Sequence, residues 1–232
     1  MEKVIAALWA GEDRQHFNAR LLAELPDALR REGATRIRLN IRDSAVEPGS
    51  ALIQQWQTPQ QDAVVQFWLP SANARFRQAI DGTLAHLCTR FAAWLAVEST
   101  IIPNETFPPR AGERCAGWSQ ASFITFRPDL DRHEAISFWH SHHTRVAIET
   151  QANFEYVQNL LVLPLTENTP AYDAFVEECF PAEALTDSGV FFDAAGNAEK
   201  LKANVDAMMK SCERFIEFGR IDIIPTSQYD FG

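Results

Sequence analysis

Short apolar runs and longer periodic segments alternate along the chain and predict its secondary structure. In the first half, strands are expected at 3–9, 35–42, 62–69 and 95–102, and helices at 13–32 and 72–93. In the second half, strands are expected at 119–127, 154–163, 173–180 and 219–225. A helix is expected at 132–149, and a further helical region lies within 183–217. The two halves therefore have the same order of elements.

Three pairs of segments suggest that the chain repeats itself. DAVVQFWLPSA, which starts at Asp62, resembles DAFVEECFPAE, which starts at Asp173, and both close an apolar run with proline. ATRIRLNI from Ala34 corresponds to NFEYVQNL from Asn153. VESTIIP, which ends at Pro103, corresponds to RIDIIP, which ends at Pro225. Each half then has the order βαββαβ of a ferredoxin-like unit.

This order predicts an α+β fold in which two ferredoxin-like βαββαβ halves form one barrel. A ferredoxin-like sheet carries its helices on one face and leaves the other face bare, so it needs a partner. The proline-rich stretch between residues 104 and 117 can link two such sheets within one chain. We expect a degenerate half at residues 1–110 and a half with the functional site at residues 111–232.

The charge of the chain argues against nucleic-acid and membrane partners. Twenty-one basic residues stand against thirty-one acidic ones, giving a formal charge of −10, which repels phosphate backbones and anionic lipids. The densest basic run is interrupted by acids and resembles a solvated face; it contains Arg30, Arg31, Arg36, Arg38 and Arg42. We therefore expect no nucleic acid and no membrane partner.

The cysteines and the amino terminus indicate a cytoplasmic protein. The four cysteines are far apart and form no CxxC pair, so they are expected to be free thiols in a reducing compartment. The apolar run near the amino terminus is too short for a membrane span and lacks a signal-peptide cleavage region.

Three histidines cluster in the segment ISFWHSHHTRVAIET, which starts at Ile136. Asp131 and Glu134 resemble a capping box, so the helix is expected to begin near residue 132. At about 100° per residue, Trp139 and His143 then fall on the apolar stripe of the helix. An imidazole in that stripe needs a hydrogen-bond partner.

The other two histidines have less favourable positions on this helix. His140 lies beside the stripe and His142 lies on its flank, facing solvent. His140 and His143 are three positions apart and could share a metal ion, but no third ligand completes the set on this helix. We therefore expect no metal, and a core histidine without chemistry stays open for His143.

The second half resembles the EthD family of dimeric α+β barrel proteins. Its opening strand FITFRPDL is followed by W-x-x-x-H (Trp139 and His143), by Y-x-x-N (Tyr156 and Asn159), and by a strand with Glu177 near its end. The match spans residues 121 to 225. In the first half, Arg20 and Glu24 fall at the positions of the tryptophan and histidine. The chain therefore looks like a fused tandem version with at most one complete site.

The resemblance implies a cofactor-independent enzyme of lyase, dehydratase or isomerase type. The expected substrate is a small apolar carbonyl or phenolic compound, aromatic or polyketide-like, held in a barrel lumen lined by Trp139. His143 would transfer a proton near neutral pH, and Glu177 would orient it. Trp139, His140, Tyr156 and Asn159 would contact the substrate. Strand parity, however, separates Tyr156 from Asn159 and Glu177 from Glu178.

Three alternatives concern the activity and the assembly of the chain. The fold also suits a non-catalytic small-molecule-binding or accessory protein of a degradation pathway. Haem chemistry stays open because related barrels bind haem through a helix histidine, although no cofactor is expected. Fusion already supplies both sheets, so a monomer would be sufficient, but barrels of this class often associate further, and a homodimer is expected.

Overall fold

The computed structural model describes all residues from Met1 to Gly232. The strands are β1 (Glu2–Trp9), β2 (Thr35–Ile41), β3 (Ala63–Leu69), β4 (Arg90–Ile102), β5 (Trp118–Ile124), β6 (Glu155–Pro164), β7 (Ala174–Phe180) and β8 (Asp222–Asp230). The α-helices are α1 (Arg14–Arg31), α2 (Ala74–Leu87), α3 (Arg132–Phe138), α4 (Thr144–Thr150), α5 (Ser188–Phe191) and α6 (Ala198–Cys212). The shorter helical segments are η1 (Ser44–Leu52), η2 (Trp139–His143), η3 (Ala182–Leu185) and η4 (Phe218–Arg220).

All eight strands form one closed antiparallel barrel. The strand order is β1-β3-β2-β8-β5-β7-β6-β4, and the barrel closes where β4 pairs with β1. Strands of the two chain halves meet at β2–β8 and at β4–β6. Closure leaves no free sheet edge, and successive side chains along each strand point alternately into the barrel and out toward the helices.

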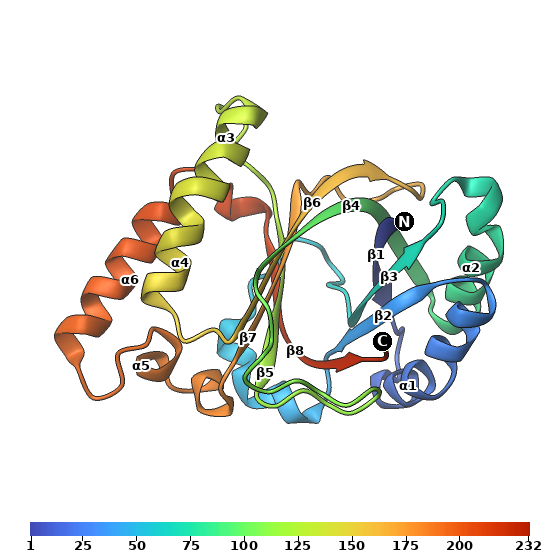
Figure 1. Ribbon diagram of the computed structural model, residues 1–232, viewed down its shortest axis with the longest axis horizontal. Coiled ribbons are helices and arrows are strands. Elements are labelled where there is room, and N and C mark those ends of the chain that lie inside the picture. The colour runs from blue at the N-terminus through green and yellow to red at the C-terminus, as the bar shows by residue number, and fades with distance from the viewer.

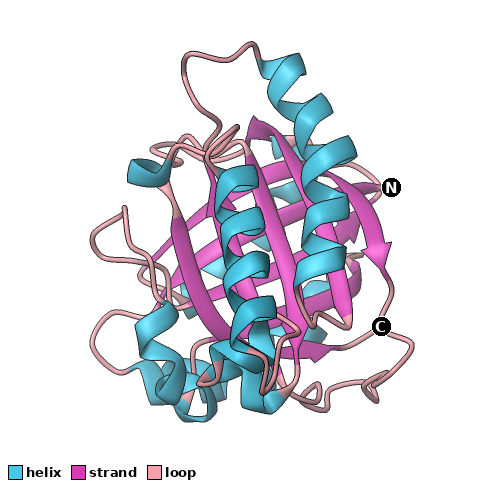
Figure 2. Ribbon diagram, turned by 90° about the vertical axis from the view of Figure 1, so that its left-hand side faces the viewer, coloured by secondary structure: helices cyan, strands magenta, loops and turns pink.

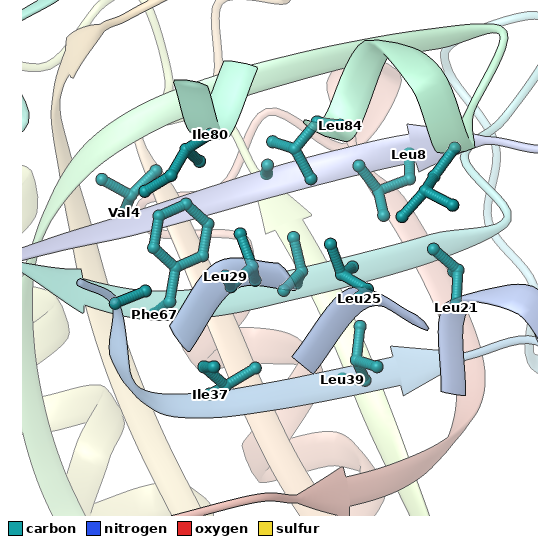
Figure 3. Packing of buried hydrophobic residues seen from close by; sticks show 14 of the residues in the cluster. Val4, Leu8, Leu21, Leu25, Leu29, Ile37, Leu39, Phe67, Ile80 and Leu84 are labelled. Carbon is teal, nitrogen blue, oxygen red and sulfur yellow. The ribbon is translucent and has the colours of Figure 1, made fainter. Parts of the chain in front are cut away.

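The helices cover the outside of the barrel on two opposite sides (Figure 1). On one side, α1 and α2 pack on the strands of the first half. Leucines at four-residue spacing in α1, namely Leu21, Leu25 and Leu29, are completely buried there. Figure 3 shows how these leucines interdigitate with Val4, Phe67 and Leu84. On the other side, α3, α4 and α6 cover the strands of the second half (Figure 2).

The interior of the barrel has an apolar part and a polar part. Aromatic side chains fill the apolar part, where Trp94, Phe123 and Tyr172 are in mutual contact. The polar part is centred on Glu177, which is completely buried. Residues that line the barrel and residues that face the helices therefore form separate environments.

The closed barrel and the order of its elements agree with the expectation, whereas several element bounds were wrong. The strand expected at 95–102 begins at Arg90, and the helix expected at 132–149 is divided into α3, η2 and α4. The helix expected at 72–93 ends at Leu87, because the backbone from Arg90 onward pairs with β1. The strand expected at 219–225 runs instead over Asp222–Asp230. Proline has no backbone N–H group to donate, so Pro225 was expected to end the strand. Here β8 continues past Pro225 and pairs with β2.

One arginine of the basic run is not on a solvated face. The side chain of Arg38 is only 20% exposed and enters the polar part of the barrel, where it forms ion pairs with Glu155, Glu177 and Asp230. Arg38 was expected at the surface because one charged residue among several gives no sign of its partners. The strand register places it inside.

Candidate functional site

A cavity of about 180 Å³ lies between the helices of the second half and the outer face of the barrel. Fourteen of its twenty lining residues are hydrophobic, so the cavity favours an apolar occupant. Its roof comes from η2 and α6, and its floor comes from β5, β6, β7 and β8. The polar residues of its wall are Gln54, Gln120, Ser122, His143, Gln151 and Glu178.

The histidine-rich helix places Trp139 and His143 in this cavity. Asp131 caps the helix by accepting hydrogen bonds from the backbone N–H groups of His133 and Glu134. From Trp139 to His143 the helix widens into a π-turn, and the Thr144 hydroxyl donates to the Trp139 carbonyl at 2.9 Å. Such turns occur frequently at functional sites. Trp139 is fully buried and His143 is 8% exposed, as the helix phase predicted.

The other two histidines of the cluster are exposed on this helix. His142 stacks on Phe138, with ring centroids 4.9 Å apart, and His140 lies against Trp139 from outside. Neither residue lines the cavity. His140 was expected to contact the substrate, and the structure does not bring it into the cavity wall.

His143 is held by contacts from α6 and from the loop that follows it. Its Nδ1 lies 2.9 Å from the Ser211 hydroxyl, and its ring centroid lies 4.8 Å from that of Phe215. Burial, with a smaller effect of His142, lowers the pKa of His143 to about 4. The expectation that His143 titrates near neutral pH is therefore wrong, because burial disfavours the charged ring. At neutral pH His143 is an uncharged imidazole.

Three polar side chains form a row across the floor of the cavity. Gln120 of β5 and Tyr156 of β6 are both register partners of Glu178 in β7. Asn153 donates to Glu178 Oε1 at 2.8 Å, whereas Gln120 reaches Oε2 only at 3.5 Å. No lysine, arginine or histidine forms an ion pair with this carboxylate. Burial raises the pKa of Glu178 to about 7, and the Asn153 contact opposes this shift only partly.

Glu177 does not reach His143, and this is a correction to the expected pairing. Glu177 points into the barrel, while His143 lies outside it, since neighbouring residues of a strand face opposite sides. Inside the barrel Glu177 accepts hydrogen bonds from Arg38, Asn40, Gln66 and Gln228. Burial alone would raise the pKa of Glu177, but the charge of Arg38 and the amide donors outweigh it and lower the pKa to about 2.

The same alternation separates the two residues of the Y-x-x-N motif. Tyr156 lines the cavity, and its hydroxyl accepts a hydrogen bond from Gln158 at 2.7 Å. Burial raises the pKa of Tyr156 well above its usual range, so its hydroxyl stays protonated. Asn159 faces the barrel interior and accepts a hydrogen bond from Lys3 at 2.7 Å. The expected separation of these residues is present, and Asn159 does not line the cavity.

The pocket was expected in the barrel lumen, so several of the residues that line it on the outer face of the barrel were not predicted. Trp139 lies outside the barrel, because the helices of this fold pack on the outer face of the sheet. Glu178, Gln120, Ser122 and Ser211 were not predicted. Strand parity could have identified Glu178, because it already placed Glu177 and Glu178 on opposite faces. Ser211 gave no signal, since its role depends on how α6 packs against η2.

The cavity does not fit a haem group, and no set of acidic, histidine or cysteine side chains is grouped as metal ligands. A cavity of about 150 Å³ holds a single benzene ring. The present cavity of about 180 Å³ is far too small for a porphyrin with four pyrrole rings. No group of three or more histidine, cysteine, aspartate or glutamate side chains is arranged to bind a metal ion.

A family comparison agrees with the resemblance of the second half. Residues 127–218 match the EthD domain. The matched segment contains Trp139, His143, Tyr156, Glu178 and Ser211, so the cavity described above is built largely from the EthD segment. The first half of the chain lies outside the match. No curated protein matches the sequence.

Solved structures with the same fold include an anthrone oxidase-like protein. It shares 8% sequence identity with this chain at a TM-score of 0.60, and the alignment covers 100% of this chain and 94% of that one. A chlorite dismutase-like protein aligns with a TM-score of 0.47 at 10% identity, covering 98% of this chain and 95% of that one. At these identities the first likeness shows the fold alone. None of the helices is sufficiently long and apolar to span a membrane.

Proposed function

We propose that this protein is a cofactor-independent enzyme that moves a proton on a small apolar carbonyl or phenolic compound. The observation that carries the proposal is a largely apolar cavity whose wall holds a buried neutral imidazole and a buried carboxyl group without an ion pair. Strongly perturbed titratable groups in a pocket are typical of catalytic sites. The reaction would be a lyase, dehydratase or isomerase reaction of EthD type.

The lining of the cavity supports an aromatic substrate. Trp139, Tyr156 and Phe215 offer ring faces and edges, and Met208 and Met209 offer adaptable sulfur contacts. A volume of about 180 Å³ slightly exceeds that of a benzene-sized cavity, so a single substituted ring fits better than a polycyclic compound. The proposed substrate is therefore a single-ring aromatic carbonyl or phenol.

His143 is proposed to contact the reacting oxygen of this substrate. When the Ser211 hydroxyl donates to Nδ1, the ring carries its proton on Nε2, which forms no hydrogen bond with another protein group. An N–H donor in an apolar cavity stabilises negative charge that develops on a substrate oxygen. Tyr156, whose hydroxyl stays protonated, is proposed as a second contact to the substrate.

We further propose that the chain is a fused pair of ferredoxin-like halves with one site, at residues 1–110 and 111–232. The repeated order of strands and helices supports this proposal. At the first-half positions that correspond to the tryptophan and the histidine, Arg20 and Glu24 form an exposed ion pair. The first half is thus proposed to stabilise the barrel and to carry no second site.

A homodimer is also proposed. Its support is a group of exposed apolar side chains where β4 and β6 pair, namely Val97 at 58%, Val162 at 53% and Leu163 at 52% exposure. Exposed apolar groups of this kind often mark contacts between proteins. Light scattering at micromolar concentration should give twice the chain mass of 26.2 kDa, and a single chain mass would overturn the proposal.

The alternative is a non-catalytic small-molecule-binding or accessory protein, which the same cavity would allow. A screen of single-ring phenols and ketones separates the two functions. Both functions predict that a bound compound raises the melting temperature, because binding stabilises the folded state. Only the enzyme changes the compound, which NMR of the recovered ligand detects. Ligands that stabilise the protein and always return unchanged would overturn the proposed enzyme function.

A further inference from the structure

Among the buried carboxylates, Glu178 has the weakest set of hydrogen-bond and ion-pair partners. Its neighbour Glu177 is bound by Arg38, and Glu155 is bound by the same arginine. Asp222, which is completely buried, accepts hydrogen bonds from the backbone N–H groups of Trp56 and Gln57. Glu178 is 6% exposed, and its contacts are two side-chain amides. A buried carboxylate with so few partners is costly for a merely structural role.

A second polar group in the same cavity also lacks a partner. Ser122 is 5% exposed, its hydroxyl oxygen is buried, and it forms no hydrogen bond. It lines the cavity together with Glu178. Buried polar groups in native proteins are almost always satisfied, so an orphaned hydroxyl in a cavity wall points to a ligand that completes it.

The geometry points to Glu178 as the proton acceptor of this site, acting on a single-ring aromatic compound with an enolisable ketone, with Ser122 hydrogen-bonded to the same ligand. This inference rests on the proposed function and names its base and substrate class. Oε2 of Glu178 is the freer oxygen, since its one contact, with Gln120, is 3.5 Å long. The opposite wall supplies His143, so a ligand between them meets an acceptor on one side and a donor on the other.

The proposed step balances without an oxidant or a further reactant. The Glu178 carboxylate takes a proton from the carbon next to the ketone, and the C–H electron pair moves into a carbon–carbon double bond as the carbonyl becomes an enolate. His143 donates a hydrogen bond to the enolate oxygen. The neutral Glu178 carboxyl then returns the proton to the substrate. Return to the same carbon from solvent-exchanged Glu178 replaces hydrogen with deuterium in D₂O. In a ketone with a carbon–carbon double bond one position further on, the enolate is conjugated with that bond, and return of the proton to its far carbon moves the double bond and isomerises the compound.

Several titratable groups face Glu178 from the elements packed around it. They are Tyr156 of β6, Cys212 of α6 and His143 of η2. Burial raises the pKa values of Tyr156 and Cys212, and the Glu178 charge raises them further, so both stay neutral. His143 is neutral above about pH 4. With a pKa of about 7, Glu178 is the group among these that changes charge near neutral pH.

The test is deuterium exchange of enolisable single-ring ketones, catalysed by the full chain and monitored by ¹H NMR. The ketones are acetophenone, 4-hydroxyacetophenone and phenylacetone in D₂O, with the protein-free rate subtracted. Glu178→Gln should lower the exchange rate by about 10²- to 10⁴-fold, the usual contribution of a general base. Glu149→Gln, a matched change at an exposed glutamate of α4, should leave the rate unchanged. Circular dichroism and melting temperature check that both variants fold.

The pH profile supplies a second measurement on the same samples. Wild-type exchange should rise with pH to a plateau with its midpoint near 7, and His143→Gln should lower the plateau without moving the midpoint. Folded Glu178→Gln protein that exchanges at the wild-type rate, or a midpoint near 4, would overturn the role of Glu178 and leave the proposed function intact. Wild-type protein that exchanges none of the three ketones would overturn this inference, whereas the proposed function falls only if every phenol and ketone that binds is recovered unchanged.

Discussion

Glu177 and Glu178 are neighbours in the chain, yet they lie on opposite sides of the barrel wall and in opposite electrostatic environments. Glu177 faces the interior, where Arg38 and three amide side chains bind it. Glu178 faces the helix layer, where it lines a mainly apolar cavity. The pKa of the first carboxyl falls to about 2, and that of the second rises to about 7. Glu177 therefore belongs to the polar network of the barrel interior, whereas Glu178 lines the cavity without a cationic partner.

Replacement of the two neighbouring histidines should give very different results. His143→Ala removes the proposed donor from the cavity wall and should lower ketone exchange by about 10²- to 10³-fold, as loss of one such donor typically does. His142→Ala should leave the rate unchanged, because His142 is exposed and does not line the cavity. Exchange rates measured at pH 8 decide this, and equal losses in both variants would contradict the assignment.

The stability of Glu178→Gln should differ from that of wild type only above acidic pH. The carboxyl loses its proton near pH 4.5 in the unfolded chain but near 7 in the folded one, so the folded state binds more protons between these values. Wild-type stability therefore falls as pH rises from 4.5 to 7, by about 3 kcal/mol in total. Glu178→Gln lacks this loss. Urea unfolding at pH 4.5 and pH 8 measures it, and a pH-independent difference between the proteins would refute the burial of a charge there.

Burial of His143 should make stability depend on pH in the opposite direction to burial of Glu178. Its pKa is about 4 in the folded protein and 6.5 in the unfolded chain, so the unfolded state binds more protons between these values. Stability is then lost as pH falls from 6.5 to 4, again by about 3 kcal/mol. His143→Gln should abolish this acid-side loss. Urea unfolding midpoints at pH 4 and pH 7 measure this difference. The control is His142→Gln, which should keep the wild-type change in stability between these pH values.

Arg38 should be among the most sensitive positions for stability. Arg38→Met leaves Glu155 and Glu177 as buried charges without a cationic partner, which typically costs about 3 to 5 kcal/mol. Arg20→Met removes the exposed ion pair with Glu24 and should cost less than about 1 kcal/mol. Chemical unfolding at pH 7 tests both variants, and similar small costs would show that the barrel network contributes little.

The order of elements and the phase of the histidine helix could be predicted from the sequence because both depend on local patterns. The alternation of the strands placed Tyr156 and Asn159 on different faces, and the helical spacing placed Trp139 and His143 on one stripe. Which face of the sheet carries the pocket could not be predicted in this way. The face that carries the pocket depends on where the helices pack, and it determines whether Glu177 or Glu178 lines the cavity. The Ser211 contact to His143 depends on the same packing.

The position of the site outside the barrel can be measured directly with two tryptophans. Trp139 lines the cavity under the helices, whereas Trp94 lies in the aromatic part of the barrel interior. Their indole N–H resonances in a ¹H–¹⁵N spectrum, assigned with Trp139→Phe and Trp94→Phe, report ligand binding at each place. Titration with 4-hydroxyacetophenone should shift the Trp139 resonance and leave that of Trp94 in place. A shift of the Trp94 resonance with an unmoved Trp139 would place the ligand in the lumen and contradict the account.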